Sequence, residues 1–170
     1  AKRFIVHKEI YDSFTQRVVE LMKTRTWGDP LGEVQPDIGP MARVDLRDEL
    51  HEQVVKSVAS GARLELGGAV PDSHGAFYPP TVLSDVKPGM PAYDEELFGP
   101  VAAIICAESD EDAIRIANDS SFGLGAAVFS CDLRKAENIA RNSLKAGCCF
   151  VNDFVRSDPR LPFGGIAESG

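Results

Sequence analysis

The chain has 170 residues, of which 44% are hydrophobic and 26% charged, a composition typical of a globular domain with a core of its own. A formal net charge of -8 without a basic stripe argues against nucleic acid as a partner. No apolar run approaches the roughly 20 residues that span a bilayer, so no membrane partner is expected.

The chain begins with Ala1 rather than Met, and its first residues are not a secretory signal. We therefore expect a piece of a longer, cytoplasmic protein. Three of the four cysteines, Cys106, Cys148 and Cys149, lie in apolar strand-like runs, and no pair has C-x-x-C spacing. This pattern favours buried thiols in a reducing compartment over disulfides. The three histidines are far apart, so no metal site is expected.

Helices and short strands alternate in the first half of the chain. The β-branched run at residues 3–7 predicts a strand. A helix should follow, because apolar residues recur on one face until Gly28-Asp29-Pro30 breaks the pattern. The members of this apolar face are Phe14, Val18, Leu21 and Met22.

A second helix is predicted with Asp45 as its N-cap and Gly61 as its stop signal. Residues 63–66 then alternate like a strand. Residues 78–83 are expected to be extended, and Pro79-Pro80 favour an edge strand or an irregular one. The apolar face of the helix is Leu46, Leu50, Val54 and Val58.

The second half of the chain alternates strand, helix, strand, helix, strand. Continuous apolar runs predict strands at residues 101–106, 126–129 and 148–151. Ser109 opens one helix with a capping-box pattern, and Asp132 can cap another that stops at Gly147. The apolar residues expected on these helices are Ala113, Ile114 and Ala117, then Leu133, Ala136, Ile139, Ala140 and Leu144. The predicted fold class is α/β, a layered domain with a mostly parallel sheet.

Three consecutive carboxylates, Asp94, Glu95 and Glu96, precede a predicted strand, and Phe98 follows in the turn. One interpretation is a solvated acidic turn with one aromatic side chain in the core. The other is a carboxylate at a sheet edge, where α/β proteins bind ligands. Such a carboxylate can accept hydrogen bonds from two neighbouring sugar hydroxyls. The residues alone leave both interpretations open.

The tail after Asn152 has little periodicity and mixes aromatic with polar residues. It suits the wall of a substrate pocket, and equally a surface loop anchored by one phenylalanine. The pairs Gly67-Gly68 and Gly164-Gly165 do not have the spacing of phosphate-binding motifs, so we interpret both as turns.

An ordered set of short motifs runs through the whole chain. The set is RFIV at 3–6, GPM at 39–41, GG at 67–68, PTVL at 80–83, EELFGPV at 95–101, FGL at 122–124, VN at 151–152 and PFGG at 162–165. In this order they resemble the catalytic domain of NAD(P)-dependent aldehyde dehydrogenases, which implies a three-layer α/β domain with a mostly parallel sheet. GPMAR at 39–43 followed by DLRDEL at 45–50 is most similar to bacterial succinate-semialdehyde dehydrogenases.

The resemblance implies roles for four residues. Glu96 is implied to bind the nicotinamide ribose of NAD or NADP, and Phe98 to help position the nicotinamide. Phe163 is implied to line the substrate tunnel. Ser157 lies in the loop where semialdehyde enzymes of this family can hold the substrate carboxylate.

The resemblance also implies where the missing chemistry lies. In this family a cysteine thiolate attacks the aldehyde, NAD(P)+ takes the hydride and a glutamate activates water. That cysteine is expected just upstream of Arg3, with the base and most of the dinucleotide site further upstream. We therefore expect residues 1–170 to be a catalytic domain without its nucleophile segment and without the C-terminal oligomerisation tail. No catalytic residue is assigned in the chain, and Cys148 and Cys149 are not expected to substitute.

Two hypotheses follow. In the first, the parent protein is a homo-oligomer that oxidises a small-molecule aldehyde with NAD or NADP, succinate semialdehyde being one candidate, while the 170-residue chain alone is inactive. In the second, the chain is a truncated, non-catalytic module for binding or assembly. Asn118 and Asn152 match motif positions and are interpreted as structural in either case.

Overall fold

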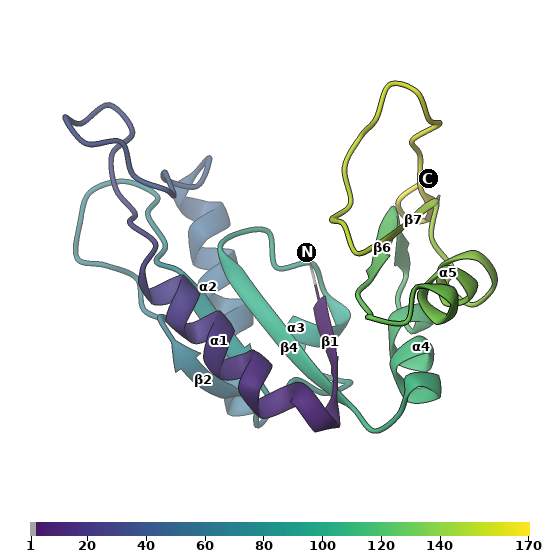
Figure 1. The fold of residues 1–170 in the computed structure, drawn as a ribbon. Coiled ribbons are helices and arrows are strands. Elements are labelled where there is room, and N and C mark those ends of the chain that lie inside the picture. The colour runs from purple at the N-terminus through teal and green to yellow at the C-terminus, as the bar shows by residue number, and fades with distance from the viewer. Residues whose placement is uncertain (1–2) are drawn as a thin grey trace. The chain divides into compact units, whose positions relative to one another are not determined.

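The computed structural model describes residues 3–170, and the chain divides into two compact units. The first unit extends to Ala107, and the second comprises Glu108–Gly170. Both units are mixed α/β structures (Figure 1). Each unit has its own sheets and helices, so each is described by itself.

The first unit is built on a four-stranded sheet of order β1-β4-β3-β2. Strand β4 pairs in parallel with β1 on one side and with β3 on the other, and β2 adds antiparallel to β3. The sheet is therefore mostly parallel, as the sequence predicts. The strands are β1 (Arg3–His7), β2 (Arg63–Leu66), β3 (Thr81–Ser84) and β4 (Val101–Ala107).

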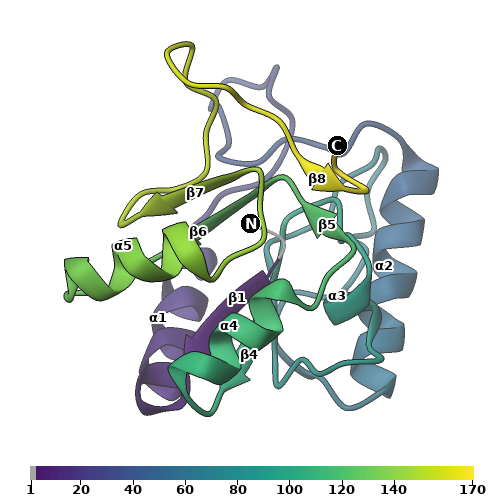
Figure 2. The same cartoon turned by 90° about the vertical axis from the view of Figure 1, so that its right-hand side faces the viewer.

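Helices lie on both sides of this sheet (Figure 2). Helix α1 (Tyr11–Lys23), which follows the 3-10 turn η1 (Lys8–Ile10), packs on one face. Helices α2 (Val44–Ala59) and α3 (Pro91–Asp94) lie on the other side and contact each other. The first unit thus has three layers. Its α1-side core is formed by Val6, Tyr11, Val82, Ala102 and Ile104.

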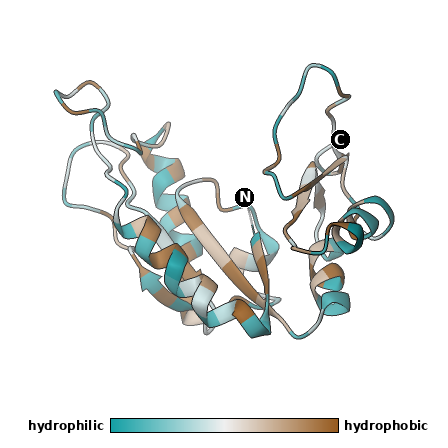
Figure 3. Ribbon diagram, in the orientation of Figure 1, coloured by the Kyte–Doolittle hydropathy of each residue, from teal (hydrophilic) through white to brown (hydrophobic). Residues whose placement is uncertain are grey.

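The sheet is the most apolar part of this unit. Strand β4 is drawn largely in brown in Figure 3, and Ile104 at its centre is fully buried. Alternate residues of a strand point to opposite faces, so Ala102 and Ile104 meet α1 while Ala103 and Ile105 point to the other side. Covering of both faces explains why β4 is a continuous apolar run.

The second unit contains two parallel strands, β6 (Gly125–Val128) and β7 (Cys148–Val151), with α5 (Leu133–Asn142) packed against them. Helix α4 (Asp110–Asn118) precedes them. A second pair, β5 (Phe122–Gly123) and β8 (Ile166–Ala167), is antiparallel. The three apolar runs of the second half therefore do not share one sheet, because β4 pairs with β1 and β3 and not with β6.

The predicted helix caps of this unit are confirmed. Ser109 accepts a hydrogen bond from the Asp112 N–H at 3.2 Å, and Asp132 accepts one from the Lys135 N–H at 3.0 Å. The Asp112 carboxylate also reaches back, but to the Glu108 N–H, one residue before the cap. Both helices therefore begin where the sequence predicts.

Several local predictions are wrong. Asp45 does not cap α2, because the helix begins at Val44 with Arg43 at the N-cap position, and the Asp45 carboxylate pairs with Arg43. The edge alternative for β3 is wrong, because the strand is internal, whereas its pairing with β2 does contain the irregular register that is the other alternative. Pro79-Pro80 precede the first paired residue of β3 and remove no N–H from the ladder.

Leu21, Val58 and Leu133 are 43%, 37% and 56% exposed, so they lie outside the apolar faces assigned to them. Helix α5 ends at Asn142, so Gly147 does not stop it and Leu144 lies beyond its end.

Within residues 3–170 no helix is long and apolar enough to cross a membrane. All four cysteines are free thiols. Cys106, Cys148 and Cys149 are half-buried in their strands, whereas Cys131 is exposed.

Candidate functional site

Glu96 and Phe98 lie on the turn that joins α3 to β4 in the first unit. Successive side chains of this turn alternate between solvent and core: Glu96 is exposed, Leu97 is 7% exposed and Phe98 is 77% exposed. The core aromatic of the acidic-turn interpretation is therefore wrong, because the buried anchor is Leu97 and the aromatic ring faces solvent. The exposed ring is available for contact with a ligand, although exposure by itself does not single it out, since Phe129 and Phe154 are 69% and 65% exposed.

The backbone of the turn is fixed by hydrogen bonds. The Gly99 N–H donates to the Leu97 carbonyl at 3.0 Å, and the Thr81 N–H of β3 donates to the Pro100 carbonyl at 2.9 Å. Gly99 also lies against Leu50 of α2, and a Cβ at this position would overlap that side chain. The turn is thus held by the sheet on one side and by α2 on the other.

A hollow of about 490 Å³ opens beside this turn. It is mostly apolar, and Glu96 supplies its one charged side chain. Among residues 3–170 the Glu96 carboxylate has no hydrogen-bond or ion-pair partner, so both of its oxygens can accept hydrogen bonds from a ligand. The lining residues are Ile38, Gly39, Pro40, Met41, Ala42, Leu46, Glu96, Leu97, Phe98, Gly99 and Pro100. The sequence marks the GPM motif of this lining but gives it no role in the site.

Ser157 and Phe163 belong to the long loop that follows β7 in the second unit. Both are exposed, Phe163 by 43%. Asn152 begins the loop at a positive φ of 53°, and its carboxamide accepts from the Ser130 N–H and donates to the Ser130 carbonyl, each at 2.9 Å. The end of the loop returns to Gly147, where a Cβ would overlap the Gly164 backbone.

Ion pairs brace the loop on both sides of Ser157. Arg160 donates two hydrogen bonds to Asp158, at 2.9 Å and 2.7 Å, and these lower the pKa of the Asp158 carboxyl to about 2. Arg156 pairs with Asp153 at 3.0 Å. The exposed Ser157 is therefore carried on a loop whose charged neighbours are paired with each other.

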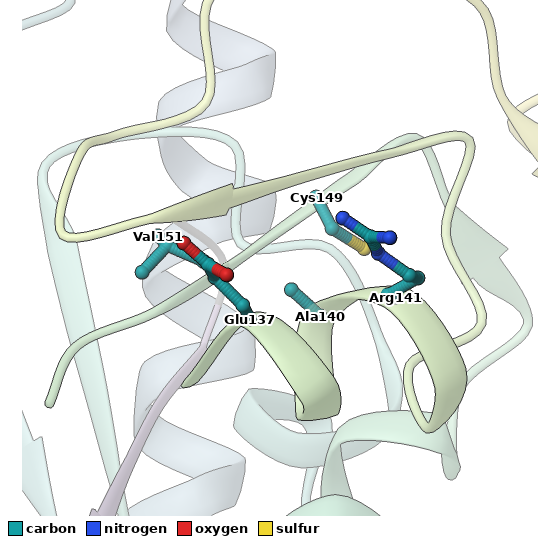
Figure 4. Close-up of a pocket in the computed structure, with 5 residues that line it drawn as sticks. All are labelled: Glu137, Ala140, Arg141, Cys149 and Val151. Carbon is teal, nitrogen blue, oxygen red and sulfur yellow. The ribbon is translucent and has the colours of Figure 1, made fainter. Parts of the chain in front are cut away.

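A second hollow in this unit, of about 220 Å³, lies between α5 and β7 (Figure 4). Glu137, Ala140 and Arg141 line it from α5, and Cys149 and Val151 line it from β7. Burial raises the pKa of the Cys149 thiol, and the neighbouring Cys148 raises it further. A thiol with a raised pKa is a poor nucleophile, because the thiolate is the reactive form.

The four residues implied by the resemblance form two pairs. Glu96 and Phe98 stand in the first unit, and Ser157 and Phe163 in the second. Within each pair the side chains share one turn or one loop, and all four are exposed. No group of three or more His, Cys, Asp or Glu side chains that could hold a metal ion is found in the part of the chain that the structure describes.

A mostly parallel α/β sheet that presents a carboxylate and an aromatic side chain beside an open hollow is typical of a nucleotide-binding enzyme domain. Residues 1–170 match the aldehyde dehydrogenase family, and the chain belongs to that family.

Several proteins with sequences or structures similar to this chain are succinate-semialdehyde dehydrogenases. The chain is 49% identical over its whole length to the succinate semialdehyde dehydrogenase [NAD(P)+] Sad of Escherichia coli strain K12, and 43% identical to a succinate-semialdehyde dehydrogenase [NADP(+)] of Mycobacterium leprae. It spans 36% and 37% of the length of these relatives. In the solved succinic semialdehyde dehydrogenase of Streptococcus pyogenes in complex with NADP+, 97% of this chain superposes with a TM-score of 0.91 at 36% identity, on 36% of that chain. The succinate-semialdehyde dehydrogenase of Burkholderia pseudomallei matches all of this chain at 32% identity and a TM-score of 0.94, over 35% of its own length.

Proposed function

We propose that the protein oxidises an aldehyde to the carboxylic acid with NAD+ or NADP+, and that residues 1–170 form part of its catalytic domain. The observation that carries this proposal is the unpaired Glu96 carboxylate beside the exposed Phe98 ring, in a chain that matches the aldehyde dehydrogenase family throughout. The Streptococcus pyogenes relative in complex with NADP+ supports the choice of cofactor.

The residues present fit a dinucleotide. Both oxygens of Glu96 can accept hydrogen bonds from the two neighbouring hydroxyls of a ribose. The Phe98 ring offers a flat apolar face for a planar heteroaromatic ring. When bound, NAD(P)+ supplies the hydride acceptor for the oxidation. The contribution of Glu96 and Phe98 is to bind and orient.

For the substrate we propose succinate semialdehyde, in line with the names of the Escherichia coli and Mycobacterium leprae relatives. The Ser157 hydroxyl is proposed to donate a hydrogen bond to the substrate carboxylate, and Phe163 to line the path to the reacting carbon. The exposure of Ser157 supports this role, because its hydroxyl is accessible to a ligand.

The nucleophile is proposed to be a cysteine upstream of this chain. Its thiolate would form a covalent adduct with the aldehyde carbon, and after oxidation a water molecule would release the acid. None of the four thiols in the chain is assigned that role. The half-burial of Cys148 and Cys149 and the raised pKa of Cys149 support this.

Steady-state kinetics of the full-length protein test the proposal. We expect reduction of NAD+ or NADP+ with succinate semialdehyde as substrate. A Ser157→Ala variant should raise KM for succinate semialdehyde about tenfold, the effect of one hydrogen bond to a charged group. The same variant should leave KM for butanal, which has the chain length but no carboxylate, unchanged.

Absence of dinucleotide reduction with every aldehyde tested would leave the chain as a module for binding or assembly. An equal rise of KM for both aldehydes would remove the Ser157 assignment and keep the enzyme. We further propose a cytoplasmic homo-oligomer, which light scattering of the purified protein and cell fractionation can test.

A further inference from the structure

The side chain of Gln53 joins α2 to the turn that carries Glu96. Its Nε2 donates a hydrogen bond to a carboxylate oxygen of Glu95 at 2.8 Å and another to the Glu96 carbonyl at 3.4 Å. Both partners are acceptors, so only the NH2 end of the carboxamide can face them. Gln53 itself is half-buried, whereas both of its acceptors belong to exposed residues of the turn.

Gln53 belongs to a stripe along α2 that follows the turn. Leu46, Leu50, Gln53 and Ser57 recur at spacings of four, three and four residues, which places them on one face of the helix. Leu46 lines the hollow and Leu50 lies against Gly99. Gln53 donates its hydrogen bonds to Glu95 and Glu96, which precede Gly99 in the turn.

Ser57 fastens the other end of the same segment. It is fully buried, accepts a hydrogen bond from the Ala92 N–H at 2.9 Å and donates one to the Gln53 carbonyl at 2.8 Å. Helix α2 therefore holds the chain at Ala92, at Glu95 and at Gly99. Glu96 lies between the last two of these points.

In this arrangement the backbone of Glu96 is held in place and its carboxylate is left accessible to a ligand. The Glu96 backbone is fixed by Gln53 on one side and by the buried Leu97 on the other, while the Glu96 carboxylate has no partner among residues 3–170. A carboxylate that must meet two hydroxyls at once is sensitive to displacements of about 1 Å. Loss of the Gln53 contact would let the backbone of the turn shift without removing any group that touches a ligand.

We propose that Gln53 is a positioning residue for dinucleotide binding, which acts by fixing the turn that presents Glu96 and Phe98. This inference rests on the proposed function. It concerns affinity for the dinucleotide and not the chemical step, because Gln53 reaches the site only through the turn.

The test uses the full-length protein with the variant Gln53→Leu. We expect Kd for the dinucleotide, from fluorescence titration, and KM for the dinucleotide to rise together about five- to tenfold, as for loss of one charge-assisted hydrogen bond. The values of kcat and of KM for the aldehyde should stay within about twofold. The matched control is Gln16→Leu, because Gln16 makes the same amide-to-carboxylate bond with Glu20 on α1, at 3.2 Å.

A charge swap distinguishes positioning from general loss of stability. Gln53→Glu places a carboxylate beside Glu95 and should weaken dinucleotide binding more than Gln53→Leu. The double variant Gln53→Glu/Glu95→Gln restores a donor and an acceptor between the two positions and should recover part of the affinity. A purely structural role would give no such recovery in Kd.

Hydrogen exchange provides a readout that needs no cofactor. Amides of residues 96–99 should exchange faster in Gln53→Leu than in the wild type, and no faster in Gln16→Leu. Equal Kd values for Gln53→Leu and Gln16→Leu, with the wild type binding normally, would overturn the inference and leave the proposed function standing. A wild type that binds neither NAD+ nor NADP+ would overturn both.

Discussion

At the scale of single residues, the turn between α3 and β4 combines one buried side chain with two exposed ones. Leu97 is buried and anchors the turn, whereas Glu96 and Phe98 on either side of it face solvent. Exposed large aromatic groups lose apolar burial that a core position would give. The proposed dinucleotide site gives this exposed ring, and the Glu96 carboxylate that has no partner among residues 3–170, a role in ligand binding.

The charge of Glu96 is expected to matter for cofactor affinity. In a Glu96→Gln variant of the full-length protein, KM for the dinucleotide should rise about tenfold or more, since a hydrogen bond to a charged acceptor is the stronger kind. Steady-state kinetics with varied dinucleotide measure the change. The matched control is Glu33→Gln, an exposed loop glutamate of the same unit. A KM equal to that of the control would exclude Glu96 from the site.

Asp158 gives a pH prediction. Arg160 lowers the pKa of the Asp158 carboxyl from its ordinary value of 3.8 to about 2. A lowered pKa means that the pairing is present above pH 3.8 and is lost as pH falls through about 2. NMR titration of the side-chain carboxyl should show this, and Arg160→Gln should return the pKa toward its ordinary value. An unchanged titration in the variant would mean that Arg160 is not the cause.

At the scale of elements, the loop after β7 returns to pack on Gly147, and only one of the two glycines at this contact has to be a glycine. A Cβ at Gly147 would overlap the backbone of Gly164, whereas a Cβ at Gly164 would meet nothing within 4 Å. Overlap with backbone is hard to relieve, because no side chain can rotate away.

Gly147→Ala should therefore destabilise the protein by about 1–3 kcal/mol, as over-packing does. Gly164→Ala, its matched control, should stay within about 0.5 kcal/mol of the wild type. Urea unfolding followed by circular dichroism measures both. Equal midpoints for the two variants would show that the loop does not pack against Gly147.

The sequence predicted most elements because their signals are local. The capping residues Ser109 and Asp132 are read from a few neighbouring positions, and the apolar run of β4 follows from burial of both faces. The pairing of strands is not local. The sequence therefore did not reveal that β4 pairs with β1 across 100 positions, nor that β3 is internal.

The candidate site was predicted less completely than the fold. Glu96 and Phe98 were identified through motifs, and their exposure agrees with a binding role. Gln53 and Ser57 were missed, because the helix was interpreted through its apolar positions. Gln53 and Ser57 each stand one residue before a position of the predicted apolar face. Their role could be inferred only once the structure showed which segment they bind.

At the scale of the whole molecule, the two units and the unassigned thiols lead to a prediction about the chain by itself. A polypeptide of residues 1–170 should form no reduced dinucleotide with any aldehyde, because the covalent step requires an activated thiolate. Burial raises the pKa of Cys149, which disfavours that form.

Absorbance of the reduced dinucleotide measures the activity, with the full-length protein as the control. Circular dichroism should first establish that the isolated chain is folded. Turnover by the folded chain would contradict the assignment of the nucleophile to an upstream segment.

Asn152 has a consequence for how this loop can change during evolution. Its carboxamide bonds both backbone groups of Ser130, so a side chain takes the place of the next residue in the β6–β7 ladder. The register of β6 and β7 is thereby fixed before the loop begins. Insertions or deletions after residue 152 would lengthen or shorten the loop without shifting the strands, so the loop can change in length and sequence while the two strands remain constant.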